Sequence, residues 1–407
     1  MPQLSYCPNC LQDSIETFYT VDPVPVHSVM LVPARDEALH FPVGRITLGF
    51  CAACGFIGNT SFDESKMNYS PKCEETQGFS PTFQSFHHRL AKDLIERYAL
   101  RNKFVLEIGC GKGEFISMLC AMGGNRGIGF DPAFVPQRRP EESGDAVEFV
   151  QDFYSEKYTH IKADFIACKM TLEHIPDTRY FVSMVRRAIG DSLDTTVFFQ
   201  VPDMSRVLKD VAFWDVYHEH CSYFTAGALR NLFTISGFDV MDVWTDYDDQ
   251  YLMIAARPRK SSLGEVEVLS PPSSTDVSAV RSFAREAERR IGLWQQSIDR
   301  LKREGQHVVI WGSGSKGVAF LSALGAQAED GGIEYAVDIN PYRKGCFMPG
   351  TGQEIIEPAF LSAYRPEVVI AMNSIYIPEI GADLKHLGVS ATVLPIEAVE
   401  AVVPRDV

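Results

Sequence analysis

The segment WDVYHEHCSYFT, residues 214–225, carries side chains that could act on a proton or on a metal ion. It includes Tyr217, His218, Glu219 and His220 in consecutive positions. Histidine titrates near neutral pH, so it can serve as a general base, and it is also a common metal ligand. The two histidines do not share a helical face, and no further ligand cluster stands near them in the sequence, which disfavours a metal site. Whether the segment is an active site or the polar rim of a core depends on the elements that position it.

Two CxxC pairs near the N-terminus have the ligand set of a closed tetrahedral zinc site. The segment between them is rich in turns and β-forming residues, as in a zinc ribbon, although its 40 residues exceed the usual spacing. Four thiolates leave no open coordination position, so we expect Zn²⁺ to be structural rather than catalytic. A redox dithiol or unmetallated thiols are the alternatives. The predicted ligands are Cys7, Cys10, Cys51 and Cys54.

Residues 103–133 read as a strand, a glycine-rich turn, a helix and a second strand. The glycines let the backbone approach a ligand closely, and an acid at the end of the second strand could accept hydrogen bonds from both ribose hydroxyls of a nucleoside. This ExGxGxG pattern resembles motif I of the class I S-adenosylmethionine (SAM)-dependent methyltransferases. The resemblance implies a SAM site, with Asp152 and Phe153 of the next strand and loop beside the adenine. The motif itself supplies Glu107, Gly109, Gly111, Gly113 and Asp131.

Further strands are expected within residues 147–156, 163–170 and 195–203, as a doubly wound sheet requires. A new helix is expected to begin at Thr225, so the segment before it should lie over the carboxyl edge of the sheet, where ligands bind in such folds. The turn LEHIPD brings Glu173 and His174 near the same edge, and helix capping and a functional role are equally open for them.

The C-terminal part contains a second nucleotide-binding pattern. Residues 257–280 are rich in serine and proline and indicate a boundary, and a long amphipathic helix should follow up to residue 305. GxGxxG occupies residues 312–317, and Asp338 ends the next strand 21 residues later. Taken alone, this is a dinucleotide fingerprint, which supports an NAD(P)-binding oxidoreductase domain as an alternative. Four side chains could contact a diphosphate, although solvated surface charge is the commoner explanation: Lys316, Arg343, Lys344 and Asn373.

With these motifs, the run Tyr-x-Glu-His and the segments DINPYRKGCFMPGTGQEIIEP and EVVIAMNSIYIPEI make the chain similar to the three-domain sugar C-methyltransferases. This family methylates a nucleotide-linked keto-sugar at the carbon next to the ketone. The resemblance implies that His220 is the general base. Glu219 could hold its tautomer and Tyr217 could donate to the enolate oxygen. It also implies three domains: a zinc-binding module at 1–75, a class I methyltransferase core at 76–258, and a linker helix with a Rossmann-like domain at 259–407.

The composition is ordinary for a folded soluble protein, with 45% apolar and 22% charged residues, and the motifs above predict the α/β class. A net charge of −15 argues against nucleic-acid or membrane-surface partners. The sequence shows neither a secretory signal pattern nor a run of apolar residues long enough to span a membrane, so a cytoplasmic enzyme is expected. We expect a SAM-dependent C-methyltransferase that acts on a nucleotide-linked keto-deoxysugar. An O- or N-methyltransferase acting on a related small molecule and a cofactor-sensing scaffold are the alternatives.

Overall fold

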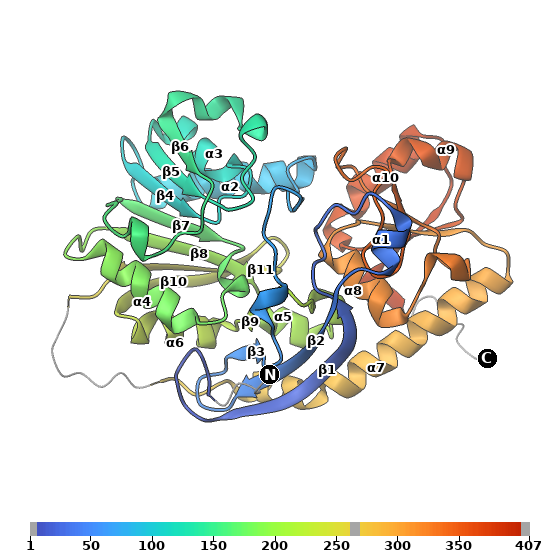
Figure 1. Cartoon of the computed structure of the whole chain (residues 1–407), viewed down its shortest axis with the longest axis horizontal. Helices are drawn as coiled ribbons and strands as arrows, with labels where there is room; N and C mark the ends of the chain where they lie inside the picture. The colour runs from blue at the N-terminus through green and yellow to red at the C-terminus, as the bar shows by residue number, and fades with distance from the viewer. Residues whose placement is uncertain (1–5, 261–268, 400–407) are drawn as a thin grey trace.

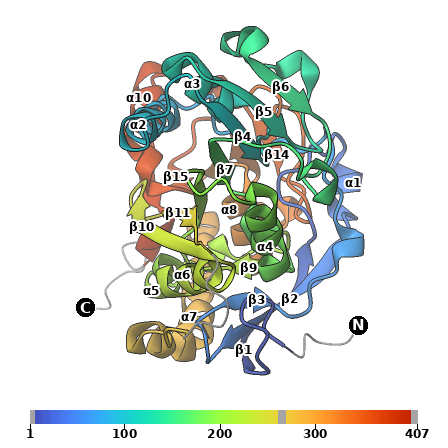
Figure 2. The ribbon, with the colours of Figure 1, turned by 90° about the vertical axis from the view of Figure 1, so that its left-hand side faces the viewer.

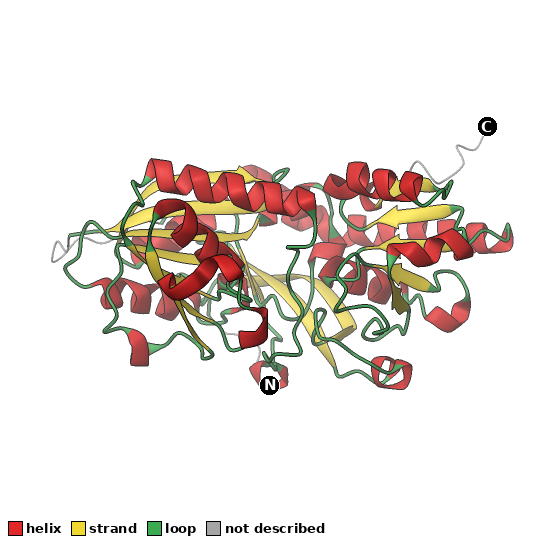
Figure 3. Cartoon of the chain, turned by 90° about the horizontal axis from the view of Figure 1, so that it is seen from above, coloured by secondary structure: helices red, strands yellow, loops and turns green. Residues whose placement is uncertain are grey.

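The computed structural model describes residues 6–260 and 269–399. Figure 1 shows a larger α/β unit, a smaller α/β unit formed by the C-terminal part, and a curved N-terminal sheet that extends below both. Seen from above, strands flanked by helices lie at both ends of the molecule (Figure 3). The predicted α/β class is confirmed. Within the described ranges, no helix is both long and apolar enough to cross a membrane.

The N-terminal sheet contains β1 Ile15–Pro25, β2 Val43–Cys51, β3 Ile57–Asn59 and β9 Ser222–Tyr223. It is antiparallel, in the order β1-β2-β3-β9, so its last strand comes from the histidine-containing segment. Between β1 and β2, the chain forms helix α1 (Arg35–Leu39) and reaches the C-terminal unit, where the Phe347 amide donates to the Val32 carbonyl at 2.8 Å. This excursion accounts for the long spacing between the CxxC pairs.

The larger unit holds a seven-stranded sheet in the order β10-β11-β8-β7-β4-β5-β6. Neighbouring strands from β8 to β6 in this order are parallel, and β11 is antiparallel to both of its neighbours. The strands are β4 Phe104–Ile108, β5 Arg126–Phe130, β6 Val147–Val150, β7 Phe165–Lys169, β8 Thr196–Pro202, β10 Phe238–Asp246 and β11 Tyr251–Pro258. The doubly wound sheet expected from the sequence is confirmed.

Helices cover both faces of this sheet, as Figure 2 shows for the unit turned toward the viewer. One apolar cluster joins α2 and α3 to one face, and another joins α4 and α6 to the other, which is why the central strands are apolar throughout. Helix α6 begins where predicted, because Thr225 Oγ1 accepts from the Ala228 amide at 3.3 Å. The helices are α2 Pro81–Arg97, α3 Glu114–Gly123, α4 Thr178–Ile189, α5 Met204–Lys209 and α6 Ala226–Ile235.

The C-terminal unit has a parallel five-stranded sheet in the order β14-β13-β12-β15-β16. Its long helix α7 spans Ser274–Arg303, so the helix begins earlier than predicted, and residues 261–268 of the expected linker lie outside the described residues. The α7 side chain Phe283 packs against Tyr19 of β1 at a ring-centroid distance of 5.0 Å. The other elements are β12 Val308–Trp311, α8 Ser315–Leu324, β13 Tyr335–Val337, β14 Glu354–Ile356, α9 Leu361–Tyr364, β15 Val368–Ala371, α10 Ile377–His386 and β16 Thr392–Pro395.

Candidate active site and metal centre

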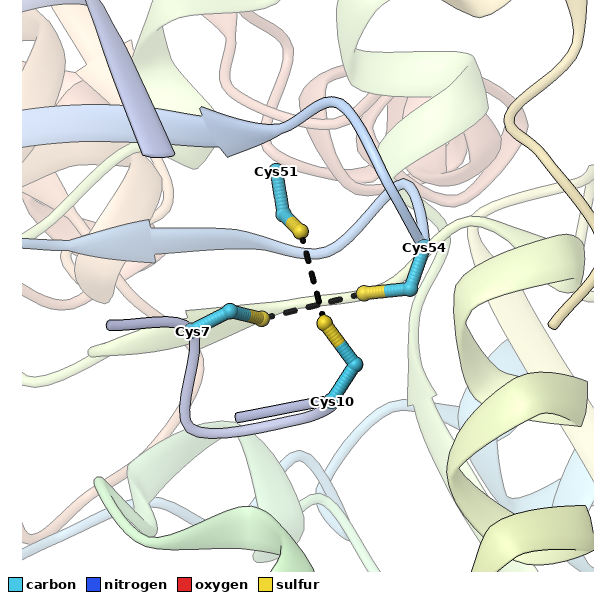
Figure 4. A group of neighbouring side chains, drawn as sticks. All are labelled: Cys7, Cys10, Cys51 and Cys54. Carbon is cyan, nitrogen blue, oxygen red and sulfur yellow. Dashed lines mark hydrogen bonds between the residues drawn. The ribbon is translucent and has the colours of Figure 1, made fainter. Parts of the chain in front are cut away.

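The four cysteines of the CxxC pairs converge on one point (Figure 4). Cys7 Sγ lies 3.7 Å from Cys54 Sγ, and Cys10 Sγ lies 3.6 Å from Cys51 Sγ. A tetrahedral zinc ion with zinc–sulfur bonds of about 2.3 Å separates its sulfur ligands by roughly 3.8 Å. The donors and their spacing therefore fit Zn²⁺.

This cysteine cluster is docked on helix α6 of the larger unit. The Asn9 side chain lies 3.8 Å from Cys54 Sγ and donates to the Ala228 carbonyl at 3.1 Å. Asn231 of α6 donates in turn to the Cys54 carbonyl at 3.2 Å. An ion held by the thiolates would therefore fix the N-terminal sheet to the larger unit.

The glycine-rich loop after β4 leaves no room for a side chain at Gly109. Gly109 has a φ of 70°, and a Cβ there would lie 1.9 Å from Oγ1 of Thr171. The Asp131 carboxylate accepts from the amides of Gly111 at 2.9 Å and Ala133 at 2.7 Å, which fixes it at the end of β5. The loop glycines and Asp131 thus meet at the carboxyl edge of the sheet.

The other predicted cofactor residues lie in different settings. Glu107 is 2% exposed and lies beneath the loop, where burial raises its pKa and the charge of Lys169 opposes that shift. Asp152 accepts from the Tyr158 hydroxyl at 2.6 Å, so its carboxylate has a local partner. Phe153 is 56% exposed and is therefore open to a ligand.

His220 lies in a compact polar cluster. Its ring centroid is 4.2 Å from that of Tyr217 and 4.7 Å from that of His174. Ligand atoms of Glu173, His174 and His220 all lie within 4.8 Å of one another. The expectation that no ligand cluster lies near His220 is therefore wrong: the turn after β7, distant in sequence, carries both residues to it. This grouping is also of a kind that can hold a divalent ion.

Burial sets the protonation of this cluster. It lowers the pKa of His220 well below its ordinary value, with a smaller contribution from His174, and it lowers the pKa of His174 to about 4. It also raises the pKa of Glu173 to about 8. Among the described residues, His220 Nδ1 and both carboxylate oxygens of Glu173 have no hydrogen-bond partner. Both imidazoles are therefore neutral at pH 7, the form that accepts a proton, and the cluster has polar atoms left for a ligand.

Glu219 points to Ser28 rather than to the imidazole of His220, which corrects the role expected for it. Its Oε1 accepts from the Ser28 amide at 2.7 Å and from Ser28 Oγ at 2.5 Å. Its main-chain carbonyl lies 2.9 Å from Nδ1 of His174. The Tyr69 hydroxyl lies 3.0 Å from that same nitrogen. Sequence reasoning gave Tyr69 no role, because its aromatic type in the segment between the second CxxC pair and α2 was the only signal.

A cavity of about 240 Å³ lies between the larger unit and the glycine loop of the C-terminal unit. Its wall includes Tyr217, Asp215 and Gln250 on one side and Gly312 with residues 314–317 on the other. Lys316 Nζ donates to Asp215 at 3.0 Å and to Gln250 at 3.2 Å, so it is not a solvated surface charge. Of the four diphosphate candidates, Lys316, Arg343 and Asn373 line the cavity, whereas Lys344 pairs with Glu357 at 2.6 Å.

Comparisons with known proteins agree with this arrangement. Residues 83–243 match a methyltransferase domain, and residues 272–394 match the C-methyltransferase C-terminal domain. The C-methyltransferase NovU of Streptomyces niveus is 28% identical over 309 residues, which are 72% of this chain and 72% of that protein. The ubiquinone biosynthesis O-methyltransferase of Salmonella paratyphi A is 33% identical over 105 residues, 25% of this chain and 43% of that protein. The structure of Burkholderia thailandensis 1,6-didemethyltoxoflavin-N1-methyltransferase aligns with a TM-score of 0.35 and 20% identity over 43% of this chain and 79% of that one.

Proposed function

We propose that this SAM-dependent methyltransferase methylates a nucleotide-linked keto-deoxysugar at the carbon adjacent to the ketone. The matches to a methyltransferase domain and to the C-methyltransferase C-terminal domain, with the similarity to NovU, support the proposal. One observation carries the proposal: the cluster around His220 contacts a residue of the cavity wall and, through Tyr69, a predicted cofactor residue. Tyr69 links the two sides, since its hydroxyl contacts His174 and its ring centroid lies 6.3 Å from that of Phe153 beside the loop. Tyr217, which packs on His220, lines the cavity.

His220 is the general base in this proposal. Its neutral imidazole takes the proton from the carbon next to the ketone, and the electrons of that C–H bond move into the enolate. Tyr217 donates a hydrogen bond to the enolate oxygen, where negative charge develops. When SAM is bound, by Gly109, Gly111, Gly113 and Asp131, it supplies the electrophilic methyl group that this carbon takes, and the protein contributes mainly alignment.

The glycine loop of the C-terminal unit serves the substrate in this proposal. The loop faces the same cavity as Tyr217, and Lys316 and Asn373 offer donors suited to a diphosphate. The alternative of an NAD(P)-binding oxidoreductase has less support, because residues 272–394 match a C-methyltransferase C-terminal domain.

An O- or N-methyltransferase activity is the second candidate. The match to an O-methyltransferase over 105 residues favours it, and the same base could deprotonate a hydroxyl or an amine. The position of the transferred methyl in the product, read by carbon NMR with labelled SAM, separates the two: a new carbon–carbon bond supports C-methylation, and a methyl on oxygen or nitrogen excludes it.

Structural zinc and a cytoplasmic location complete the proposal. The spacing of the four sulfurs supports Zn²⁺ held by Cys7, Cys10, Cys51 and Cys54. Reduced thiolate ligands persist in a reducing compartment such as the cytoplasm, which supports this location.

A thermal-shift and calorimetric screen tests the proposed substrate class. S-adenosylhomocysteine and thymidine-, guanosine- and cytidine-diphosphate sugars are added singly and in pairs, since a ligand that binds the folded state raises its melting temperature. We expect S-adenosylhomocysteine and one nucleotide sugar to stabilise the protein. Lys316→Gln should weaken binding of the nucleotide sugar. Lys344→Gln, which removes a surface lysine of the same unit, should leave that binding unchanged. Stabilisation by NAD(H), without a response to any nucleotide sugar, would overturn the proposal.

A further inference from the structure

Ser28 occupies a junction between all three parts of the chain. It belongs to the excursion that follows β1, and it is 2% exposed. Its amide and its hydroxyl both donate to Oε1 of Glu219 in the larger unit, at 2.7 and 2.5 Å. Its Oγ also lies 2.7 Å from Oγ of Ser315 in the C-terminal unit. Since the Ser28 hydroxyl has one hydrogen and gives it to Glu219, Ser315 is the donor in the second contact.

The Ser28 contact determines where Glu219 can lie. Glu219 is 3% exposed, and its Oε2 has no hydrogen-bond partner among the described residues. The Ser28 hydroxyl is therefore the side-chain donor that stabilises this carboxylate. Loss of the Ser28 hydroxyl would leave the Ser28 amide as the remaining donor to this buried carboxylate, and removing one of two donors is costly, so we expect the turn to shift. That turn carries His220 as the next residue, and the Glu219 carbonyl is the contact of His174.

The other end of the contact lies at the proposed diphosphate site. Ser315 is the first residue of α8, a ten-residue helix whose N-terminus lines the cavity. The free amides at such a terminus attract anions, and Lys316 beside it adds a cationic side chain at the same cavity wall. A diphosphate there would compete for the Ser315 hydroxyl, which now donates to Ser28.

We propose that Ser28 is a positioning residue that couples occupancy of the C-terminal glycine loop to the placement of Glu219 and His220. The inference rests on the proposed function, because it takes His220 as the base and the loop as the nucleotide site. Through Ser315, Ser28 and Glu219, three successive hydrogen-bonded side chains from three parts of the chain join the two sites.

Kinetics of Ser28 variants test the proposal. Ser28→Ala should lower kcat by about tenfold or more, with little change in the affinity for S-adenosylhomocysteine. Ser28→Thr keeps the hydroxyl, and a cavity of about 20 Å³ that borders Ser28 offers space for the added methyl, so it should restore most of kcat. Equal losses in the alanine and threonine variants, or an unchanged kcat in Ser28→Ala, would overturn the proposal.

Hydrogen–deuterium exchange measures whether nucleotide binding at one site changes the other site. This response would be the same in wild type and variants if Ser28 only stabilised the fold. Thymidine, guanosine and cytidine diphosphates are each added to the full-length protein, and exchange is followed in residues 312–317 and 214–221. In the wild type, we expect the effective nucleotide to protect both segments. In Ser28→Ala and in Ser315→Ala, the nucleotide should still protect the glycine loop from exchange, but it should no longer protect residues 214–221. Protection of both segments in every variant overturns the coupling, whereas an unprotected glycine loop in the wild type rejects the proposed nucleotide site itself.

Discussion

The hydroxyl of Tyr69 lies 3.0 Å from Nδ1 of His174, and the Glu219 carbonyl lies 2.9 Å from the same nitrogen. A main-chain carbonyl can only accept, so Nδ1 carries the hydrogen and Nε2 is left as an acceptor. Tyr69 thus brings a phenol from the segment between the second CxxC pair and α2 into the cluster around His220. This segment, as well as the larger unit, contributes to the proposed active site.

Replacement of Tyr69 by phenylalanine should lower kcat without unfolding the protein. The ring and its packing remain, but the hydroxyl beside His174 is lost, and we expect a loss of roughly tenfold to hundredfold. Steady-state kinetics with saturating SAM give the value. Tyr180→Phe is the matched control, because Tyr180 is 52% exposed and lies outside the cluster. Equal rates for the two variants would remove Tyr69 from the mechanism.

The rate should persist to unusually low pH. Burial and His174 lower the pKa of His220 well below its ordinary value of 6.5, so the base form is present above that lowered pKa and is lost only as pH falls through it. An alkaline change is expected near pH 8, where the Glu173 carboxyl, whose pKa is raised to about 8 by burial, loses its proton. A profile of kcat/KM against pH tests both limbs, and Glu173→Gln should abolish the alkaline one. An acidic midpoint at or above 6.5 would contradict this account.

Alanine at Gly109 should abolish cofactor binding. The added Cβ would meet Thr171 at 1.9 Å, and a φ of 70° disfavours any side chain there. Titration calorimetry with S-adenosylhomocysteine is the measurement. Gly292→Ala is the control, because no heavy atom lies within 4 Å of its added Cβ and it stands inside α7. That control should bind normally and gain about 0.5–1 kcal/mol in unfolding free energy.

Loss of the zinc ligands should destabilise the whole chain rather than the N-terminus alone. The cysteine cluster is docked on α6 through Asn231, and β9 of the larger unit completes the N-terminal sheet. Cys51→Ser should lower both the zinc content, measured by atomic emission, and the melting temperature. Cys346→Ser makes the same change outside the cluster and should keep one zinc per chain, as a single four-cysteine site implies. Equal metal content in the two variants would reject the zinc assignment.

Local patterns predicted the elements well. The apolar run before Gly109 is β4, and the spacing of apolar residues around Trp294 marks α7, because both patterns report burial on a regular element. Such patterns could not predict contacts between segments that are distant in the sequence. Glu219 was assigned to its neighbour His220, but in an irregular turn adjacent side chains diverge, and its partner Ser28 lies 191 residues away.

The setting of Lys316 could not be predicted for the same reason. Solvated surface charge was the commoner of two explanations for it, yet Asp215, 101 residues earlier, pairs with it in the cavity wall. Burial of a charge depends on such a partner, which no local window contains.

Proton exchange at the substrate carbon tests the central claim, that His220 is the base, most directly. The nucleotide-linked keto-deoxysugar is incubated in deuterated buffer with enzyme and S-adenosylhomocysteine, so that no methyl is transferred, and deuterium at the carbon beside the ketone is followed by NMR. We predict rapid exchange with the wild type and none with His220→Ala, while S-adenosylhomocysteine binds both proteins equally. Full exchange in His220→Ala would contradict the account.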